Sequence, residues 1–312
     1  GVCYKLDTRT EKVMLKLFYT GNGTVPVDSG LPHVGRIFGI DEQGDLRYYR
    51  YLGNGESNPT GAHNAENGAP SWDRKTSNAI GNGWQGFRHV LGCGNGVTMA
   101  VQQNGDLLWY RYDGDGTADR SGALGWDPGS SAIIGNGFHS FVHLFVKPAE
   151  GKTTRPLAQL FGVEPNGDLR WYGYSGNGEP DPSGVKGWHP NSGNVIGNGW
   201  ADFLYIVGTG DVFAVKPDGA LLWYRYNGDG TADHSGATGW DPNSGSQVGR
   251  GWQNMRIVTG GTTDVGGRGT VLFAVDQDAR LLWYRYDGNG DADPTGSLGW
   301  NPRSGTQIGR GF

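Results

Sequence analysis

The sequence predicts an all-β protein, a single domain over residues 1–312 that forms a five-bladed β-propeller of four-stranded blades. Three observations lead to this prediction: one strand motif occurs five times, two aromatic positions in each copy keep a constant spacing, and each copy has room for four short strands. The 58 glycines and 15 prolines alone would be compatible with disorder. However, 12 Trp, 14 Tyr and 11 Phe supply extensive buriable surface, so the glycines are assigned to turns between strands.

A strand that ends in paired aromatic residues defines the repeat. Its five copies span residues 46–51, 107–112, 169–174, 221–226 and 281–286. Each copy is followed by a Gly-Asn/Asp-Gly turn, a Ser/Thr-Gly pair, a tryptophan and a Gly-Asn/Arg-Gly-aromatic string. The tryptophan and the last aromatic of this string, here called the closing aromatic, are always twelve positions apart: Trp72 and Trp84, Trp126 and Phe138, Trp188 and Trp200, Trp240 and Trp252, Trp300 and Phe312. This constancy indicates one rigid supersecondary unit repeated five times.

The repeats fall at about 13–84, 85–138, 139–200, 201–252 and 253–312. In the second, strands are predicted at 87–91, 97–102, 107–112 and 131–134, with an Asn-Gly hairpin turn at 104–105. Strand 107–112 carries large apolar side chains on both faces, as expected for a strand buried between two neighbouring blades. Residues 13–20 alternate as a first strand would, and the chain ends where the first strand of a further repeat would begin. We therefore expect the N- and C-terminal strands to pair and close the ring.

Composition and motifs argue against several classes of protein. The 26 basic and 31 acidic residues give a net charge of −5 with no basic run, so binding to nucleic acid or anionic lipid has little electrostatic support. No apolar stretch approaches the roughly 18 residues of a membrane span. The sequence has no nucleophile elbow, zinc-protease motif or phosphate-binding loop, and its seven histidines are scattered over non-equivalent positions. We therefore expect a protein that is not an enzyme and has no cofactor.

The two cysteines, Cys3 and Cys93, are too few for a disulfide scaffold or a thiolate metal site. One interpretation is a small buried thiol and a second thiol near the terminus. The other is a single disulfide that ties down the N-terminus.

The repeat resembles that of the tachylectin-type propeller lectins. The resemblance is carried by the tryptophan with an aromatic residue twelve positions on, by the Ile-Gly-Asn-Gly-Trp/Phe string at 80–84, 134–138 and 196–200, and by the strand ending in Tyr. It covers the chain from about residue 13 onward and implies a five-bladed propeller with one site per blade for N-acetylated hexosamines, GlcNAc or GalNAc. Before the tryptophan, where that family has Asp-Asn-Trp, this chain has Ala-Leu-Gly-Trp at 123–126 or a variant of it, and the loop is longer.

A sugar site needs paired hydrogen-bonding groups beside an aromatic face, and the loop before each tryptophan supplies both. The candidates are the tryptophans Trp72, Trp126, Trp188, Trp240 and Trp300, the Asx residues Asn58, Asp119, Asp181, Asp233 and Asp293, the hydroxyls of Thr60, Ser121, Ser183, Ser235 and Thr295, the turn residues Asp115, Asn177, Asp229 and Asn289, and the residues that follow the tryptophans, Asp73, Asp127, His189, Asp241 and Asn301. The alternative is structural: tryptophans wedged between blades, Asp and Ser/Thr capping the turns, and tyrosines in the core. Extra residues precede Trp72, so the first site is expected to differ.

Calcium is a rival interpretation of the same loops. Asp113, Asp115 and Asp119, and likewise Asp287, Asp291 and Asp293, place oxygen ligands at alternate positions with glycines between them. Leu52, Ser175 and Asn227 occupy the opening position in the other repeats, and no bidentate Glu follows.

The function expected from these loops is multivalent binding of glycans on glycoproteins or cell surfaces by a secreted or extracellular monomer. A propeller that binds a protein partner is the alternative. Nearly identical loops around a ring favour a repeated small ligand and avidity, whereas a single protein partner favours loops that differ.

Overall fold

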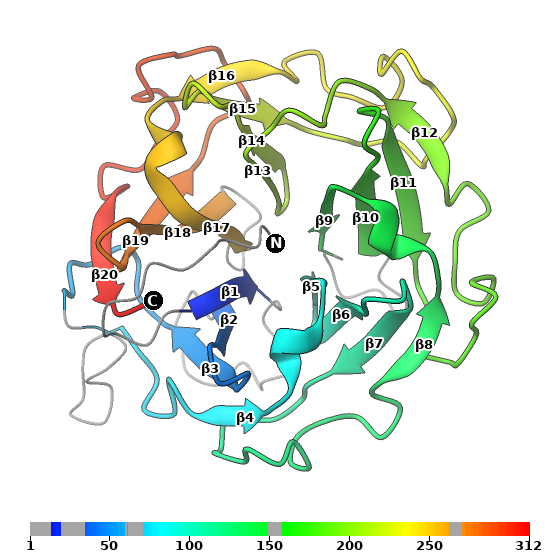
Figure 1. The fold of residues 1–312 in the computed structure, drawn as a ribbon. Coiled ribbons are helices and arrows are strands. Elements are labelled where there is room, and N and C mark those ends of the chain that lie inside the picture. Colours follow the sequence, from blue (N-terminus) through cyan, green and yellow to red (C-terminus); the bar gives the residue numbers. More distant parts are fainter. Residues whose placement is uncertain (1–13, 20–34, 60, 62–70, 149–157, 262–269) are drawn as a thin grey trace.

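The computed structural model describes residues 14–19, 35–59, 61, 71–148, 158–261 and 270–312. Its strands form five antiparallel sheets of four strands each, arranged as blades around a central axis (Figure 1). The blades consist of β1 (Met14–Tyr19), β2 (Gly35–Asp41), β3 (Leu46–Tyr51) and β4 (Ala79–Gly81); β5 (His89–Gly94), β6 (Val97–Val101), β7 (Leu107–Arg111) and β8 (Ala132–Gly135); β9 (His143–Lys147), β10 (Ala158–Val163), β11 (Leu169–Tyr174) and β12 (Asn194–Gly197); β13 (Tyr205–Gly208), β14 (Val212–Val215), β15 (Leu221–Tyr224) and β16 (Ser246–Gly249); and β17 (Met255–Gly261), β18 (Thr270–Asp276), β19 (Arg280–Tyr286) and β20 (Thr306–Arg310).

Each blade runs outward from the centre of the ring. The first strand of each blade lies innermost and the fourth lies at the rim, in chain order, as Figure 1 shows. The chain then returns to the centre through a short turn, which after β4, β8 and β16 is a 3-10 helix: η2 (Trp84–Gly86), η3 (Phe138–Ser140) and η4 (Trp252–Asn254). The glycine before each of these turns has φ between 80° and 91°. The prediction of five four-stranded blades is confirmed, with strand ends within a few residues of those expected.

The expected pairing of the N- and C-terminal strands is not confirmed. β1 pairs with β2, and β20 pairs with β19, so the four strands of every blade are consecutive in the chain. The ring closes instead through contacts between the first and fifth blades. The Trp72 indole donates a hydrogen bond to the carbonyl of Ile308 (2.9 Å), and the backbone N–H of Asn58 donates to the carbonyl of Gln307 (2.9 Å). Because each repeat already supplies all of its own strands, neither end needs to exchange one.

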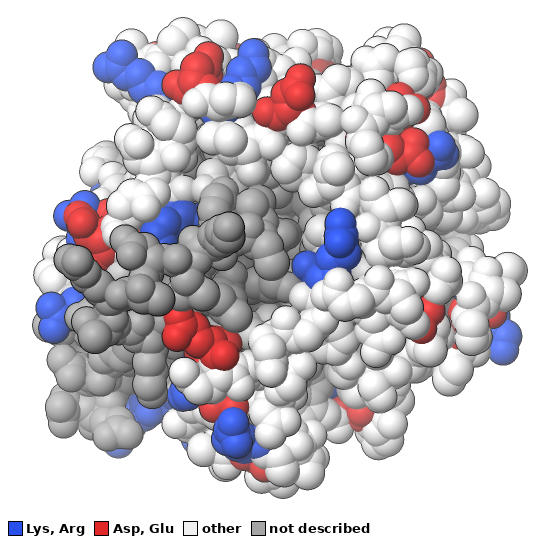
Figure 2. All heavy atoms as spheres, viewed as in Figure 1, with Lys and Arg blue, Asp and Glu red and all other residues white. Residues whose placement is uncertain are grey.

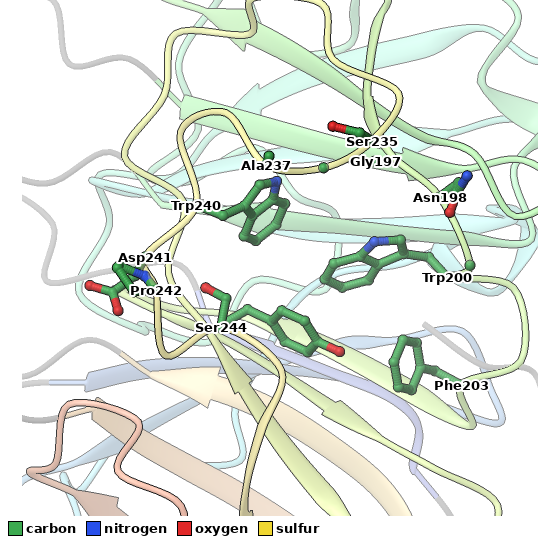
Figure 3. Close-up of a pocket in the computed structure, with 13 residues that line it drawn as sticks. Gly197, Asn198, Trp200, Phe203, Ser235, Ala237, Trp240, Asp241, Pro242 and Ser244 are labelled. Carbon is green, nitrogen blue, oxygen red and sulfur yellow. The ribbon is translucent and has the colours of Figure 1, made fainter.

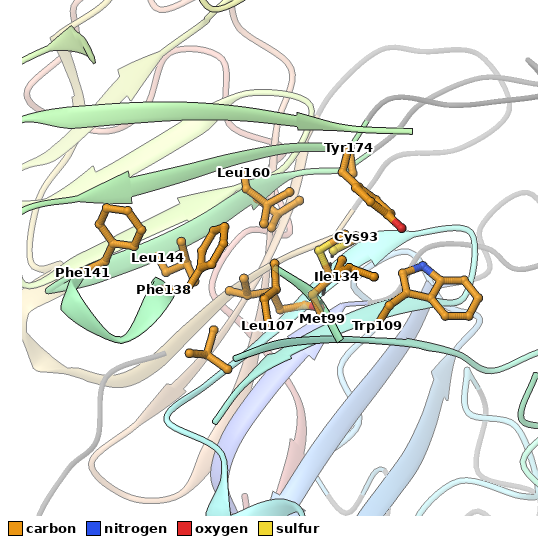
Figure 4. Packing of buried hydrophobic residues seen from close by; sticks show 14 residues of the cluster. Cys93, Met99, Leu107, Trp109, Ile134, Phe138, Phe141, Leu144, Leu160 and Tyr174 are labelled. Atoms are coloured by element: carbon orange, nitrogen blue, oxygen red, sulfur yellow. Dashed lines mark hydrogen bonds between the residues drawn. The ribbon is translucent and has the colours of Figure 1, made fainter. Parts of the chain in front are cut away.

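The hydrophobic core is divided among the interfaces between blades. The cluster in Figure 4 joins Met99 and Trp109 of the second blade to Leu160 and Tyr174 of the third. Leu107, Leu108 and Trp109 are all buried, so β7 is covered on both faces as predicted. Stability therefore resides largely in blade-to-blade packing, because an isolated blade would leave both faces of its strands in water.

Cys93 lies within this cluster as a free thiol, and burial raises its pKa to about 12. Cys3 lies outside the described residues. No helix among the described residues is long and apolar enough to cross a membrane. On the face shown in Figure 2, basic and acidic side chains are interspersed, and neither sign gathers into a single patch.

Candidate functional site

A β-bulge in each rim strand frees a backbone carbonyl, which accepts a hydrogen bond from the next blade. Opposite β11, the register of β12 skips Ile196, so this residue falls outside the regular ladder. Its carbonyl accepts a hydrogen bond from the indole Nε1 of Trp240 in the next blade (3.1 Å). A bulge of this kind redirects a backbone group that would otherwise pair within its own sheet.

The same bond joins every pair of neighbouring blades. The donors and acceptors are Trp126 and Ile80 (2.9 Å), Trp188 and Ile134 (2.8 Å), Trp300 and Val248 (2.7 Å), and Trp72 and Ile308 (2.9 Å). Each acceptor is the residue skipped in its strand pair. The tryptophans thus act as the interblade wedges of the structural interpretation, while four of them keep part of the ring exposed.

The loop aspartates close their own turns. Oδ1 of Asp233 accepts hydrogen bonds from the backbone N–H (2.9 Å) and the hydroxyl (2.5 Å) of Ser235, and Oδ2 accepts from the N–H groups of Ala237 and Thr238. The hydrogen bond from the Ser235 hydroxyl, together with those from the backbone, holds the pKa of Asp233 well below its ordinary value. The N–H of Asp233 itself donates to the carbonyl of Val195 in the preceding blade (2.9 Å).

This arrangement recurs in the other loops. Asp119, Asp181 and Asp293 each accept from the Ser or Thr two residues on and from two further backbone N–H groups, and their pKa values are lowered for the same reason. In the first blade, Asn58 Oδ1 accepts from the N–H of Gly61 (2.9 Å). Turn capping thus accounts for these side chains.

The turn residues come four positions before these loop aspartates, and three of the four contact the preceding blade. The carboxylate of Asp115 pairs with Lys75 Nζ. The backbone carbonyls of Asp229 and Asn289 accept from Asn191 (3.1 Å) and Asn243 (3.0 Å). The equivalent residue of the third blade, Asn177, is exposed.

A pocket of about 480 Å³ opens between the third and fourth blades, lined by four aromatic residues: Trp200, Phe203, Tyr224 and Trp240. Trp200 and Trp240 stack at 5.5 Å with an interplanar angle of 30°, and Tyr224 lies 4.6 Å from Trp200 between ring centroids. Burial raises the pKa of Tyr224 to about 12, so its phenol stays protonated at neutral pH and is a hydrogen-bond donor.

Polar groups complete the pocket. Asn198, Ser235, Asp241 and Ser244 line it together with the aromatic residues. In Figure 3, Ser235 and Asn198 lie on one side of the Trp240 and Trp200 pair, while Ser244 and Phe203 lie on the other. Asp241 Oδ1 accepts from the N–H of Asn243 (2.9 Å), and among the described residues its Oδ2 has no hydrogen-bond partner. The pocket therefore combines a protonated phenol, a carboxylate oxygen and hydroxyls with an aromatic wall.

Equivalent sets occur at three other interfaces, and all of their members are aromatic except Met255. The sets are Trp84, Phe87, Tyr110 and Trp126; Phe138, Phe141, Tyr172 and Trp188; and Trp252, Met255, Tyr284 and Trp300. The closing aromatic and the loop tryptophan lie 5.6, 5.9 and 6.0 Å apart in these sets. Burial raises the pKa of each of the three tyrosines to about 12. All four loop tryptophans and tyrosines of the four interfaces are half-buried.

The interface between the fifth and first blades differs. Tyr49, Trp72 and Phe312 occupy the equivalent places, yet they are only 2%, 4% and 1% exposed. Tyr49 and Phe312 contact each other at 5.1 Å between ring centroids. Thr60, a predicted site residue of this loop, lies outside the described residues. Among the described residues, the aromatic sites at four interfaces are therefore open, and the rings at the fifth interface are buried.

A family model described as Tachylectin matches residues 39–312. The chain belongs to the Tachylectin family. No curated protein matches it. Its fold is similar to solved structures of Aleuria aurantia lectin. A point mutant in complex with alpha-methyl-L-fucoside is 14% identical; the match covers 94% of this chain and 100% of that chain, with a TM-score of 0.46. The same mutant in complex with Fucalpha1-6GlcNAc is 13% identical; the match covers 97% of this chain and 99% of that chain, with a TM-score of 0.46. The BP39L lectin from Burkholderia pseudomallei is 16% identical, with coverage of 92% and 68% and a TM-score of 0.35.

This member of the Tachylectin family is a propeller of the lectin type, and its pockets gather only some of the residues predicted from the sequence. In the fourth blade, Ser235, Trp240 and Asp241 line the pocket, whereas Asp229 and Asp233 do not. The sequence reasoning missed Trp200 and Phe203, which come from the closing string of the preceding repeat and the segment after it. It also assigned Tyr224 to the core. The constant presence of an aromatic residue in every closing string was the available signal.

The calcium interpretation receives no support from the loops of this Tachylectin-family propeller. Oδ1 of Asp113 accepts from Arg111 Nε (3.1 Å), and Oδ1 of Asp287 accepts from Arg285 Nε (2.8 Å). The carboxylates of Asp119 and Asp293 cap their own turns. Across the described ranges, no group of three His, Cys, Asp or Glu side chains could hold a metal ion.

Proposed function

We propose that the protein is a multivalent lectin that binds one sugar residue in each of its four open interblade pockets, with N-acetylated hexosamines, GlcNAc or GalNAc, as the preferred ligands. The observation that carries the proposal is the pocket between the third and fourth blades. Its aromatic wall recurs at three other interfaces, with Met255 in the place of Phe203 at one of them, and its volume of about 480 Å³ is within the usual range for small-molecule sites.

The chemistry of the pocket fits such a ligand. The apolar face of a hexose packs on the exposed part of Trp240. The acetamido group has a methyl for the corner between Trp200 and Phe203, a carbonyl that accepts from the Tyr224 phenol, and an N–H that donates to the unpartnered oxygen of Asp241. Sugar hydroxyls remain for Ser235, Asn198 and ordered water.

Four similar pockets around one ring support avidity. A glycan-covered surface that engages several pockets at once is held far more tightly than one sugar in one pocket, provided that the spacing of the sugars matches. This use implies a secreted or extracellular monomer that binds glycoproteins or cell surfaces and performs no chemistry on them.

Isothermal titration with GlcNAc and GalNAc tests the proposal, with L-fucose and galactose as comparison sugars. We expect about four sites per chain for the N-acetylated sugars. Tyr224→Phe removes one phenol donor from one pocket, so the number of full-affinity sites should fall by one. Tyr49→Phe is the matched control at the buried fifth interface and should leave the stoichiometry unchanged. Equal titrations for wild type and Tyr224→Phe would contradict the assigned role of Tyr224, and no binding of any of the four sugars would contradict a lectin for simple sugars.

A protein-binding propeller is the second candidate, because exposed apolar side chains stand on three of the loops. Leu124, Val185 and Leu298 are 55%, 71% and 54% exposed. A glycan array separates the candidates: uniformly negative results, with N-acetylhexosamines included, favour the protein-binding function.

A further inference from the structure

By equivalence with the pocket between the third and fourth blades, the aromatic set of Trp252, Tyr284 and Trp300 marks a pocket between the fourth and fifth blades, and this pocket differs from the others in charge. The residue before the last Gly-aromatic pair of the closing string is Asn82, Asn136 or Asn198 at the other open pockets, and it is Arg250 here. Asn198 lines the pocket between the third and fourth blades. The substitution therefore exchanges a neutral amide at the rim of the pocket for a cation.

The backbone places Arg250 where Asn198 stands in the preceding interface. Both residues follow the glycine that pairs with the first leucine of the neighbouring strand, Gly249 with Leu221 and Gly197 with Leu169. Both precede a glycine in the left-handed region, with φ of 83° and 79°. The aromatic residue after this glycine donates its backbone N–H to the carbonyl of a hairpin glycine in the same blade. Trp252 donates to Gly219 (3.2 Å), and Trp200 donates to Gly167 (3.1 Å).

The carboxylate that serves the other rims is missing beside Arg250. In the first three blades, the hairpin between the second and third strands ends in an aspartate. This aspartate pairs with a side chain of the same blade or of the next one: Asp45 with Arg120 (2.6 Å), Asp106 with Asn136 (2.5 Å) and Asp168 with His234 (2.9 Å). The fourth blade has Ala220 in this position. Asp218 in the same hairpin accepts from the N–H of Ala220 (3.0 Å).

Arg250 is consequently exposed, and no ion pair of its guanidinium occurs among the described residues. A second change acts in the same direction. The residue after the loop tryptophan is Asp241 in the third-to-fourth pocket and Asn301 here, so a carboxylate is replaced by a neutral amide. The aromatic wall of Trp252, Tyr284 and Trp300 is retained.

We propose that the pocket between the fourth and fifth blades binds a sugar that carries an anionic group, a carboxylate or a sulfate, while the other three open pockets take neutral sugars. A guanidinium presents several N–H donors in a planar fork that matches two oxygens of such a group, and hydrogen bonds between charged partners are stronger than neutral ones. The inference rests on the proposed lectin function and adds a division of specificity among its sites.

The test is isothermal titration of the full chain with GlcNAc, with GlcNAc 6-sulfate and with N-acetylneuraminic acid. Wild type should bind an anionic probe at one site, about five- to tenfold more tightly than Arg250→Asn does. The sulfate and carboxylate probes show which anionic group is preferred. This preference should disappear near 1 M salt, where the screening length is only about 3 Å.

Two further variants make the assignment specific. Asn198→Arg should create a second site for the anionic probe, because it gives the preceding pocket the same rim residue. Arg310→Asn changes the equivalent arginine at the buried fifth interface and should have no effect on any of the titrations.

Equal affinity of wild type and Arg250→Asn for both anionic probes would overturn the inference, as would equal binding of an anionic probe at all four sites. If GlcNAc still binds at several sites, the lectin proposal stands and only the division of specificity fails. If a folded wild type binds neither GlcNAc nor the anionic probes, both proposals fail.

Discussion

The hydrogen bond from Trp240 to the bulged carbonyl of Ile196 leads to a quantitative prediction for Trp240→Phe. The substitution removes the Nε1 donor, which lies 3.1 Å from the carbonyl, but leaves an aromatic ring beside Trp200 and Tyr226. Ile196 is buried, so its carbonyl cannot readily find water in exchange. Leaving a buried acceptor unsatisfied costs about 1–3 kcal/mol, and the lost ring volume adds to this.

Trp200→Phe is the matched control because it loses the same volume without losing a hydrogen bond. Among the described residues, no hydrogen bond of the Trp200 indole is found, and the chain itself has Phe138 and Phe312 in the equivalent position. The difference in unfolding free energy between the two variants therefore isolates the bond from the indole to the carbonyl.

Thermal unfolding is the assay. For 312 residues the unfolding entropy is about 0.65 kcal/mol/K, so each kcal/mol lowers Tm by about 1.5 °C. We expect Trp240→Phe to melt about 2–4 °C below Trp200→Phe. Equal melting temperatures would refute the argument that the bulged carbonyl and the indole hold neighbouring blades together.

Four other predictions follow from the same structure. Trp72→Ala should lower stability by about 3–5 kcal/mol, because this ring is buried, and should leave the number of sugar sites unchanged in titration; a lost site would contradict the buried fifth interface. Hydrogen bonds lower the pKa values of the loop carboxyls in the folded protein, those of Asp119, Asp181, Asp233 and Asp293. The stability that they contribute is fully present above the unfolded pKa of about 4 and is lost as the pH falls from there through the lower folded pKa. A series of Tm measurements from pH 7 to pH 2 should show this loss, and the dependence of Tm on pH should be weaker in Asp233→Asn. In a Cys3→Ser variant at pH 8, Cys93 should react with a thiol reagent only after denaturation, because the thiol is buried and its pKa is about 12; rapid labelling of the native protein would contradict this. Calcium added after chelation should leave Tm unchanged, since the loop carboxylates already accept protein hydrogen bonds, and a rise in Tm would restore the calcium interpretation.

The repeat made the blades predictable, because the same spacing recurs in five copies and each copy contains the alternation of short strands. Closure was not predictable in this way. The sequence of the N-terminal strand is the same whether this strand pairs with the C-terminal strand or with the second strand of its own blade. The outcome depends on contacts such as the hydrogen bond between Trp72 and Ile308, which belong to the first and last repeats.

The site was predicted in part for a similar reason. Asp-x-Ser/Thr beside a tryptophan suits both sugar binding and turn capping, and the structure uses Asp233 and Ser235 in a cap, with Ser235 also at the pocket. Trp200 and Phe203 were not predicted as site residues, because the pocket lies between two blades. A search for polar residues within one loop cannot find a wall supplied by the preceding repeat.

Because each pocket lies between two blades, a sugar bound there would contact both of them. A ligand that touches Trp200 on one blade and Trp240 on the next binds only while the two blades stay together. By thermodynamic linkage, it opposes their separation by a free energy that grows with the ratio of the free ligand concentration to Kd. Glycan binding would thus stabilise the interfaces between blades that the ligand occupies. A surface that fills several pockets would stabilise several of these interfaces at once.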